Sequence, residues 1–447
     1  MQMGEGPPGY HFCVSSIPTP IRVLSFEGAR HAVEQHAAQV SATDTETAEL
    51  LAATGRVLAE PILADRDFPP FPRATRDGYA VRAADVTQVP TRLEVMGEIK
   101  AGDPPDPDRG GLRAGQAVSI MTGAALPPGA DAVVMVEYTT QTASSVEIQR
   151  SAATGENFVP RAAEARAGQL LIEPGTRLDP STVAIAASVG KGTLRVFRKP
   201  RIAVLSTGDE LVEINATPGP AQIRNSNTYS LAAQIQNAGG EPVLLPIAPD
   251  EPARLRALIE EGLRFDLLLL TGGVSMGKYD LVEQVLAELK AEFYFTGAEI
   301  QPGRPVVFGS CTGVEACPAE RSTLQKWRTG VSAPHEQYFF GLPGNPVSTM
   351  VTFELFVLPM IQALAGMKSR PLIFLKARLK SDIRIKTGLK RFLPASLSGE
   401  FENAEVELAR WQGSGDIAAL ARANCYIVIP PDRELIAAGE WVSLLMR

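Results

Sequence analysis

The sequence predicts a multidomain α/β protein whose largest part is a doubly wound, mostly parallel α/β domain. A chain of 447 residues is too long to fold around one ordinary hydrophobic core, and its length alone suggests about three domains. From residue 201 onward, apolar runs of strand length alternate with amphipathic runs of helix length, which is typical of βαβ units. Before and after that region, alternating β-like runs separated by Gly, Pro and Asp indicate smaller β domains.

Within the α/β region, each expected element has its own local signal. RIAVLS is a buried-strand run, and apolar residues at helical spacing predict the helices. The expected strands are 201–206, 242–247 and 266–270, and the expected helices are 229–238, 252–263, 281–290 and 347–365. The polar segment 310–337, with Cys311 and Cys317, is interpreted as a surface insertion between two strands.

The flanking regions are predicted in less detail. A loose Pro/Gly leader is followed by a helical pattern from Ser25 to Arg56, and short β runs lie at 93–99, 117–121, 132–136 and 145–148. The resulting division is a leader 1–20, an N-terminal helical or linker domain 21–66 with 157–196, a β insertion domain 67–156, an α/β domain 197–368 and a C-terminal β domain 369–447.

Composition excludes several classes of protein. The chain carries a net charge of −7 and has no dense Lys/Arg run, so we expect no nucleic-acid partner. Four cysteines without a CxxC pair indicate reduced thiols rather than a zinc site. No secretory signal is visible, and the apolar stretch 353–367 is too short and too interrupted to span a bilayer. A cytoplasmic protein without a membrane anchor is expected.

Unusual residues follow three of the expected strands: STGDEL (206–211), TGGVSMGKYD (271–280) and LPGNPVS (342–348). In a parallel sheet, ligands bind outside the carboxyl ends of the strands. In the second string, Gly272 and Gly273 allow the backbone to approach an anion closely, and Ser275 and Gly277 favour a phosphate site over a simple tight turn.

The third string has two compatible interpretations. Asn345 and Pro346 suit the N-cap and first position of a helix, which explains both residues structurally. The same helix start is an anion site if the N–H groups of Val347, Ser348 and Thr349 are unpaired within the helix.

Acidic side chains lie beside these turns. Asp209, Glu210 and Asp280 supply the oxygen ligands that Mg²⁺ shares with substrate phosphates. The alternatives are a turn role for Asp209 and a capping box formed by Asp280 with Glu283. Together with the glycine turns, the acids predict a phosphate-and-metal site.

These strings, with IQPGRPVVFG (300–309), RDGYAVRAAD (76–85) and IMTGAALPPGAD (120–131), occur in an order and spacing that resembles the MoeA-type molybdopterin molybdenumtransferases and the gephyrin E domain. The resemblance covers roughly residues 25–447. It implies a homodimer, a β insertion within a helical N-terminal part, and a C-terminal β-barrel. It also implies a substrate site shared between subunits.

The activity implied by the resemblance is molybdenum insertion. The family takes molybdate and adenylylated molybdopterin, cleaves the adenylate with Mg²⁺ and releases molybdenum cofactor. A molybdopterin adenylyltransferase is a possible partner. Because the dithiolene sulfurs of the substrate hold the molybdenum, such a protein needs no catalytic Cys or His, which fits the scarcity of both here.

Matching positions carry the implied roles. The catalytic residues would be Asp77, Thr122, Glu210, Asp280 and Arg304, with Glu210 and Asp280 as the metal ligands. The substrate-binding residues would be Gly208, Asp209, Thr271, Gly272, Gly273, Val274, Ser275, Gln301, Pro302, Gly303, Gly344, Asn345, Pro346 and Ser348.

The chain also departs from the family pattern. PRATR (72–76) replaces D-N-S-A-M and adds Arg73 and Arg76, the segment 157–165 keeps only Arg161 and Glu164 of its charged residues, and Gln301 replaces a Lys. A non-catalytic pterin-binding scaffold therefore stays open as an alternative, although Asp77, Glu210 and Asp280 favour chemistry. A CinA-like nucleotide-processing enzyme is a third alternative, which the DGYA and MTGA segments and the C-terminal β domain oppose.

Overall fold

The computed structural model describes residues 22–104, 111–273, 281–312, 336–368 and 370–447. Several predictions fall outside the described residues: the leader, Cys13, Cys317, Val274, Ser275, Asp280 and all but the ends of the 310–337 insertion. The chain forms two compact units, one of residues 1–47, 55–59 and 195–447 and the other of residues 48–54 and 60–194.

The α/β domain of the first unit contains a six-stranded sheet in the order β17-β14-β18-β23-β22-β19. Its first four strands are parallel, and β22 pairs antiparallel with both β23 and β19, so only β22 runs against the other five strands. The predicted mostly parallel fold is confirmed. The strands are β14 (Arg201–Ser206), β17 (Glu241–Leu244), β18 (Leu267–Thr271), β19 (Glu292–Phe295), β22 (Val307–Thr312) and β23 (Glu336–Leu342).

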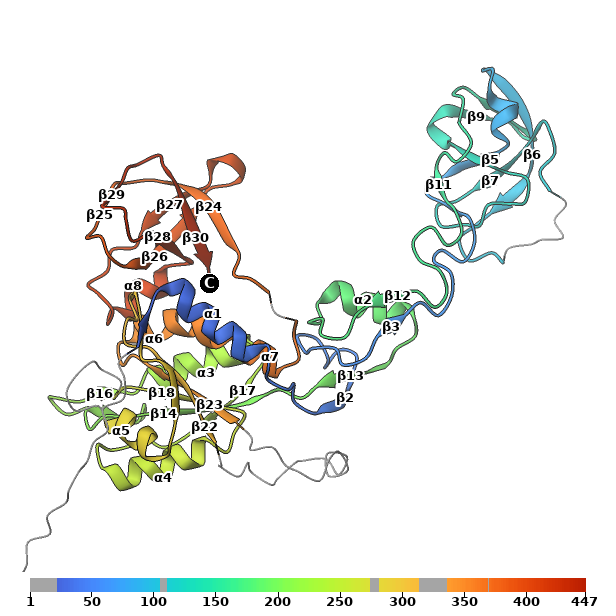
Figure 1. The fold of residues 1–447 in the computed structure, drawn as a ribbon. Helices are drawn as coiled ribbons and strands as arrows, with labels where there is room; N and C mark the ends of the chain where they lie inside the picture. Colours follow the sequence, from blue (N-terminus) through green and yellow to red (C-terminus); the bar gives the residue numbers. More distant parts are fainter. Residues whose placement is uncertain (1–21, 105–110, 274–280, 313–335, 369) are drawn as a thin grey trace, which may run out of the picture. The chain divides into compact units, whose positions relative to one another are not determined.

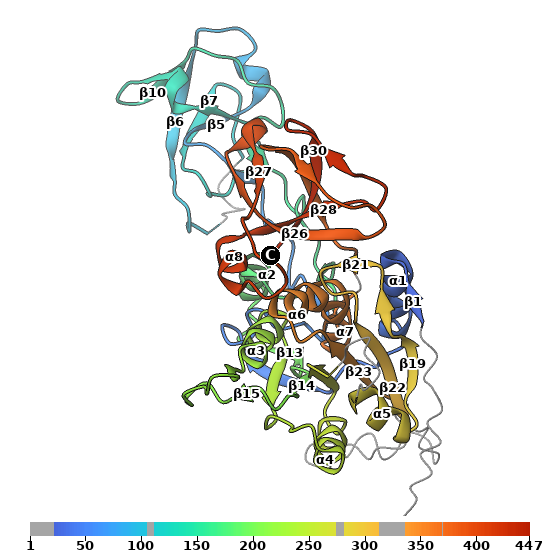
Figure 2. The ribbon, with the colours of Figure 1, turned by 90° about the vertical axis from the view of Figure 1, so that its left-hand side faces the viewer.

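Helices cover both faces of this sheet (Figures 1 and 2). Side chains alternate along each strand, so Ile202 and Val204 enter one core and Ala203 and Leu205 the other. The first core is covered by α1 (Phe26–Ala37), α3 (Asn227–Asn237), α6 (Pro346–Thr352) and α7 (Leu358–Leu364), and the second by α4 (Pro252–Gly262) and α5 (Leu281–Glu288). This two-sided burial makes the domain doubly wound.

The long helix predicted over 347–365 forms as α6 and α7 joined by a π-helical turn, Phe353–Val357. Pro359 has no N–H to donate to the carbonyl four residues earlier, at Leu355. The Arg30 guanidinium of α1 donates to that carbonyl at 2.6 Å instead. Pro346–Leu364 is long and apolar enough to cross a membrane, but 72% of it is buried inside the protein, as expected of a core helix.

The helical pattern expected from Ser25 to Arg56 is only partly right. The helix ends at Ala37, and Thr45–Glu49 forms strand β2, which pairs with β13 (Thr193–Phe197). The pairing partner lies about 150 residues further along the chain, where no local periodicity can reveal it, and the β-branched threonines suit a strand.

The second unit contains a six-stranded sheet in the order β8-β5-β7-β6-β10-β9, which confirms the β runs predicted there. Its strands are β5 (Gly78–Val81), β6 (Thr91–Ile99), β7 (Gln116–Ile120), β8 (Ala132–Met135), β9 (Thr139–Gln141) and β10 (Ser145–Ile148). The helix α2 (Pro180–Ser188) begins at Asp179, whose side chain accepts from the Thr182 N–H at 2.8 Å in a capping box.

The C-terminal domain is a closed five-stranded barrel, as the resemblance implied. Its strands are β24 (Phe374–Leu379), β26 (Lys390–Ser398), β27 (Glu405–Leu408), β28 (Cys425–Ile429) and β30 (Trp441–Met446). They pair in the order β26-β27-β24-β30-β28, and β28 pairs again with β26 to close the circle. The strand 390–398 has no clear alternation in the sequence and was not expected.

Candidate functional site

Three of the predicted turns meet at the carboxyl edge of the parallel strands. The Thr207 N–H, after β14, donates to the Thr271 carbonyl at the end of β18 at 3.0 Å. The Thr271 hydroxyl in turn donates to the carbonyl of Pro343, after β23, at 3.3 Å. Gly344 lies against Gly272, because a Cβ on Gly344 would be 3.5 Å from the Gly272 Cα. Neighbouring parallel strands thus bring the three strings together.

The two glycines after β18 are required by space as well as by backbone conformation. Gly272 has φ +86°, and a Cβ there would lie 2.5 Å from the Thr207 carbonyl oxygen. Gly273 has φ +63°, and its Cβ would lie 2.7 Å from the Thr207 hydroxyl and 2.8 Å from Val282. Any side chain would displace this turn, so the backbone itself forms the surface offered to a ligand.

Asn227, at the start of α3, was not predicted from the sequence. Its Nδ2 donates to the Thr271 hydroxyl at 3.0 Å and to the Gly344 carbonyl at 2.7 Å, so one amide group ties two of the three turns together. The only available signal was the polar string RNSN (224–227) before a helical run, which also suits an ordinary helix start.

Acidic side chains lie next to the first turn. Asp209 and Glu210 are exposed, and the Asp209 Oδ1 accepts from the Asp250 N–H at 3.1 Å. Burial, followed by the negative charges of Asp209 and Glu210, raises the pKa of Asp250. Asp250, which sequence reasoning missed, therefore adds a third carboxylate to this end of the sheet.

A metal site is not preformed among these acids. Within the described ranges, no three His, Cys, Asp or Glu residues are grouped as metal ligands. The carboxylates do fit a hard cation chemically, since they are oxygen donors whose mutual repulsion a positive charge would relieve. Asp280, the second predicted ligand, lies outside the described residues.

The start of α6 corrects one expectation. Asn345 and Pro346 occupy the N-cap and first helical position as predicted, although no capping bond from the Asn345 side chain is found in the described structure. The Val347 N–H donates to the Ser414 carbonyl at 2.9 Å, and the Thr349 N–H to the Asn345 carbonyl at 3.0 Å. Of the three N–H groups expected to be unpaired within the helix, that of Thr349 is paired there, and that of Val347 is occupied from outside the helix because the barrel domain packs against it.

Ser348 itself is only 4% exposed, and the loop 301–304 packs beside it. Gly303 has φ +103°, and a Cβ there would lie 2.4 Å from Thr352 and 3.6 Å from the Ser348 carbonyl oxygen. Pro302 is buried, whereas Gln301 and Arg304 are exposed. The loop is thus held against α6 by its glycine, with its polar residues facing solvent.

Asp77 and Thr122, each predicted as a catalytic residue, contact each other in the second unit. The Asp77 carboxylate accepts from the Thr122 N–H at 2.6 Å and from the Thr122 hydroxyl at 2.7 Å. The hydrogen bond from the Thr122 N–H, followed by the bond from its hydroxyl, lowers the pKa of Asp77. The carboxylate therefore stays ionised, and it is exposed. The next residue, Gly78, has to be a glycine, because a Cβ there would lie 1.9 Å from the Val134 carbonyl oxygen.

The two segments that depart from the family pattern lie side by side. Strand β4 (Arg73–Ala74) pairs with β11 (Phe158–Val159), and Arg73 forms an ion pair with Glu164 at 2.7 Å. Arg161 pairs with Asp67, also at 2.7 Å. Arg73, added by the first departure, is therefore neutralised by Glu164, which the second segment keeps.

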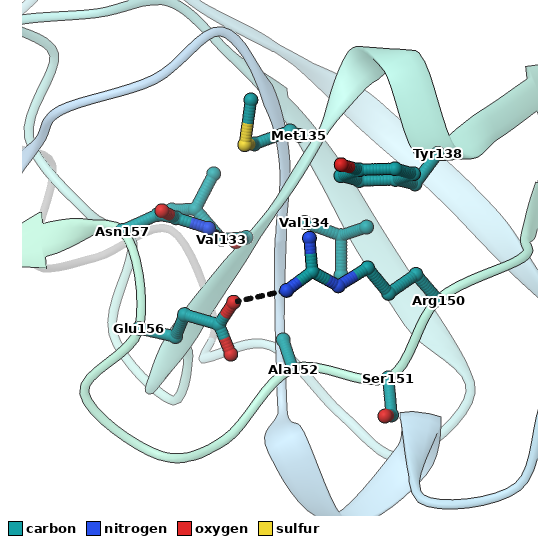
Figure 3. Close-up of a pocket in the computed structure, with 9 residues that line it drawn as sticks. All are labelled: Val133, Val134, Met135, Tyr138, Arg150, Ser151, Ala152, Glu156 and Asn157. Carbon is teal, nitrogen blue, oxygen red and sulfur yellow. Dashed lines mark hydrogen bonds and ion pairs between the residues drawn. The ribbon is translucent and has the colours of Figure 1, made fainter.

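A hollow in the second unit does not include the predicted residues (Figure 3). It is lined by Val133, Val134, Met135, Tyr138, Arg150, Ser151, Ala152, Glu156 and Asn157. The Arg150 guanidinium lies 4.7 Å from the centre of the Tyr138 ring and 3.9 Å from the Glu156 carboxylate. Its positive charge is already compensated, so this hollow is a weaker candidate than the turns.

Comparison with known proteins covers nearly the whole chain. Family models described as "MoeA N-terminal region (domain I and II)", "Probable molybdopterin binding domain" and "MoeA C-terminal region (domain IV)" match residues 24–190, 203–363 and 376–446. A molybdopterin molybdenumtransferase of Nostoc sp. is 36% identical over 91% of this chain and 89% of its own length. The Bacillus subtilis enzyme of the same name is 32% identical, over 90% of each chain.

Solved structures agree with these relatives. Two crystal structures of the molybdopterin biosynthesis MoeA protein from Pyrococcus horikoshii cover 95% of this chain and nearly all of their own, with TM-scores of 0.72 at 27% identity and 0.66 at 31% identity. The family models, the curated relatives and the fold all lead to one assignment. The chain belongs to the MoeA family of molybdopterin molybdenumtransferases.

Proposed function

We propose that this protein completes the molybdenum cofactor by transferring molybdate to adenylylated molybdopterin, with cleavage of the adenylate. The single observation that carries the proposal is the meeting of three turns, after β14, β18 and β23, around the Gly272–Gly273 backbone. A backbone surface that excludes every Cβ is suited to the close approach of a phosphate. Family membership supports the choice of a pterin phosphate as the ligand.

The two thiols within the described residues, Cys311 and Cys425, do not serve as molybdenum ligands in this scheme. Burial raises the pKa of Cys311 and of Cys425 to about 11, so both stay protonated at neutral pH. The dithiolene sulfurs of the substrate would hold the molybdenum, and the protein would bind and orient the pterin phosphate. Arg304, exposed on the loop beside α6, would hold an oxyanion by bidentate hydrogen bonds.

Magnesium would be bound at the acidic end of β14. Glu210 with Asp280 would hold it. Asp209 lies close enough to Asp250 that its negative charge, after burial, raises the pKa of Asp250. Bound Mg²⁺ supplies positive charge against the phosphoanhydride.

Asp77 and Thr122 belong to the other compact unit, and we propose that they act in a homodimer, completing the site of the partner subunit. The ionised Asp77 and its Thr122 partner would orient the leaving adenylate or the incoming oxyanion. The proposal places the enzyme in the cytoplasm, where a separate molybdopterin adenylyltransferase would supply its substrate.

The test is to incubate the purified protein with adenylylated molybdopterin, Mg²⁺ and molybdate, and to follow release of AMP and of active cofactor. Molybdate-dependent AMP release is expected, with Glu210→Ala and Asp280→Ala slowing it by about a hundredfold or more while dimerisation is retained. Tight pterin binding without AMP release would instead support the scaffold alternative.

A further inference from the structure

Two buried polar atoms at the carboxyl edge have no hydrogen-bond partner within the part of the chain that the structure describes: Thr207 Oγ1 and Asn227 Oδ1. Leaving a buried polar group unpaired costs stability, so native proteins rarely do so without a reason. Both residues border the Thr271–Gly273 turn, which is the centre of the proposed substrate site.

The Thr207 hydroxyl lies directly beneath the glycine turn. Thr207 is only 2% exposed. Cβ atoms placed on Gly272 and Gly273 would lie 3.3 Å and 2.7 Å from its Oγ1. The two glycines therefore lie against this hydroxyl, where a side chain on either residue would crowd it.

The orientation of the Asn227 amide is fixed by its partners. The Gly344 carbonyl can only accept a hydrogen bond, so it requires the Nδ2 group at 2.7 Å. The Thr271 hydroxyl already donates to the Pro343 carbonyl and accepts from the same Nδ2. Oδ1 is consequently the amide atom left without a partner, a buried acceptor.

Neighbouring buried polar groups show the opposite behaviour. Ser206, Asn225 and Thr228, all at most 5% exposed, bond to one another: Ser206 Oγ lies 2.7 Å from Thr228 Oγ1 and 3.2 Å from Asn225 Oδ1. Asn225 Nδ2 donates to Thr228 Oγ1 at 2.9 Å. Burial in this region is thus compatible with full hydrogen bonding. Three buried side-chain atoms of the described residues lack a partner, and two of them belong to residues that border the turn, while the third is Gln234 Oε1 on α3.

We propose that Thr207 and Asn227 contact the substrate directly, with Asn227 Oδ1 accepting a hydrogen bond from an N–H group of the pterin. An amide oxygen can only accept, so its partner must be a donor. The phosphate monoester dianion of the substrate has no donor, whereas a pterin carries ring N–H groups and an amino group. The Thr207 hydroxyl, which can donate, bonds to the same ligand over Gly272 and Gly273. This inference rests on the proposed function and adds two recognition residues to it.

The experiment compares matched pairs of variants, using molybdopterin as the probe under anaerobic conditions. Thr207→Val removes an unpaired hydroxyl, so we expect about tenfold weaker molybdopterin binding with unchanged or higher resistance to urea. Thr228→Val, its control, breaks a satisfied network, so stability should fall while affinity is kept. Thr207→Ser retains the hydroxyl and should restore binding.

Asn227→Ala separates pterin recognition from turn geometry. It should weaken molybdopterin binding about tenfold, while sulfate, a phosphate mimic that has no donor for Oδ1 at neutral pH, competes with an unchanged inhibition constant. Equal weakening of molybdopterin and of sulfate would mean that Asn227 only shapes the turn, and would overturn its assignment. If Thr207→Val bound molybdopterin with wild-type affinity, the assignment of Thr207 as a substrate contact would be overturned. If the wild-type protein itself failed to bind molybdopterin, the proposed function would be wrong.

Discussion

The α/β domain contains two polar regions that are built in opposite ways. At the carboxyl edge of the parallel strands, glycine backbone, exposed acids and two unpaired buried atoms surround one turn. At the antiparallel edge, the Glu336 carboxylate accepts hydrogen bonds from the hydroxyl groups of Tyr294 at 2.5 Å, Ser310 at 2.6 Å and Tyr338 at 2.9 Å.

The Glu336 region is complete without a ligand. The His36 ring of α1 stacks on Tyr294 with ring centres 3.8 Å apart, which covers the cluster from the helix side. Each hydroxyl has a partner, so the cluster contributes to folding. The difference teaches that polarity alone does not mark a binding site. The informative feature is polarity that the protein itself leaves unsatisfied.

The largest expected effect comes from filling the turn at the carboxyl edge. Gly272→Ala would place a Cβ 2.5 Å from the Thr207 carbonyl oxygen at φ +86°, so the turn must move. Because misplacing a binding group by about 1 Å can cost roughly a hundredfold in rate, AMP release should fall by about that factor. Steady-state kinetics with adenylylated molybdopterin measures the loss.

Gly309→Ala is the matched control at the other edge. Its Cβ would meet the Glu292 carbonyl oxygen at 2.3 Å and the Phe339 ring at 2.6 Å. Overpacking of this kind costs about 1–3 kcal/mol, which urea denaturation would detect, while the turnover of the folded protein is retained. If Gly309→Ala abolished turnover in folded protein, the functional separation of the two edges would be lost.

A smaller effect is expected at the satisfied cluster. Glu336→Ala should destabilise the protein by about 1–3 kcal/mol, because it leaves three hydroxyl groups without their acceptor. Turnover of the folded variant should stay near wild type. A variant as stable as wild type would show that the cluster contributes nothing to folding.

The same variant should alter the pH dependence of stability. Burial raises the pKa of Glu336, but the hydroxyl groups of Ser310, Tyr294 and Tyr338 outweigh it, so the pKa lies below its ordinary value. A lowered carboxyl pKa gives stability that is present above the ordinary pKa and is lost as pH falls through the folded one. Urea midpoints measured from neutral to acidic pH should therefore fall less steeply in Glu336→Ala.

The smallest effect is expected in the second unit. Thr122→Val removes one of the two bonds to Asp77 and keeps the backbone N–H, so the pKa of Asp77 should rise only part of the way to its ordinary value. Carbon NMR of the carboxyl group measures this shift. The urea midpoint should not change, because the pair is exposed; a lower midpoint would make it a structural pair like the Glu336 cluster.

The sequence allowed prediction of most of this architecture because burial and strand length are local properties. A strand such as RIAVLS and a turn with glycines at 272 and 273 can each be recognised from the neighbouring residues alone. What failed was non-local. Strand β2 depends on β13, the Val347 N–H is occupied by Ser414, and Asp250 joins Asp209 and Glu210 only when the sheet is formed.

Asn227 illustrates the same limit within the site. Its significance comes from bonds to Thr271 and Gly344, which are 44 and 117 residues away. Nothing in RNSN distinguishes Asn227, which bridges two turns, from Asn225, which completes a local network. Composition could suggest a polar helix start, but only the assembled sheet separates the two roles.

The bond between Arg30 and the Leu355 carbonyl also constrains when this protein can fold. The two residues are 325 positions apart, so the first helix leaves the ribosome long before its partner is made. At about 5–20 residues per second, the interval is on the order of tens of seconds. During synthesis the N-terminal helix must wait, with its apolar face uncovered, until almost the entire α/β domain has been translated.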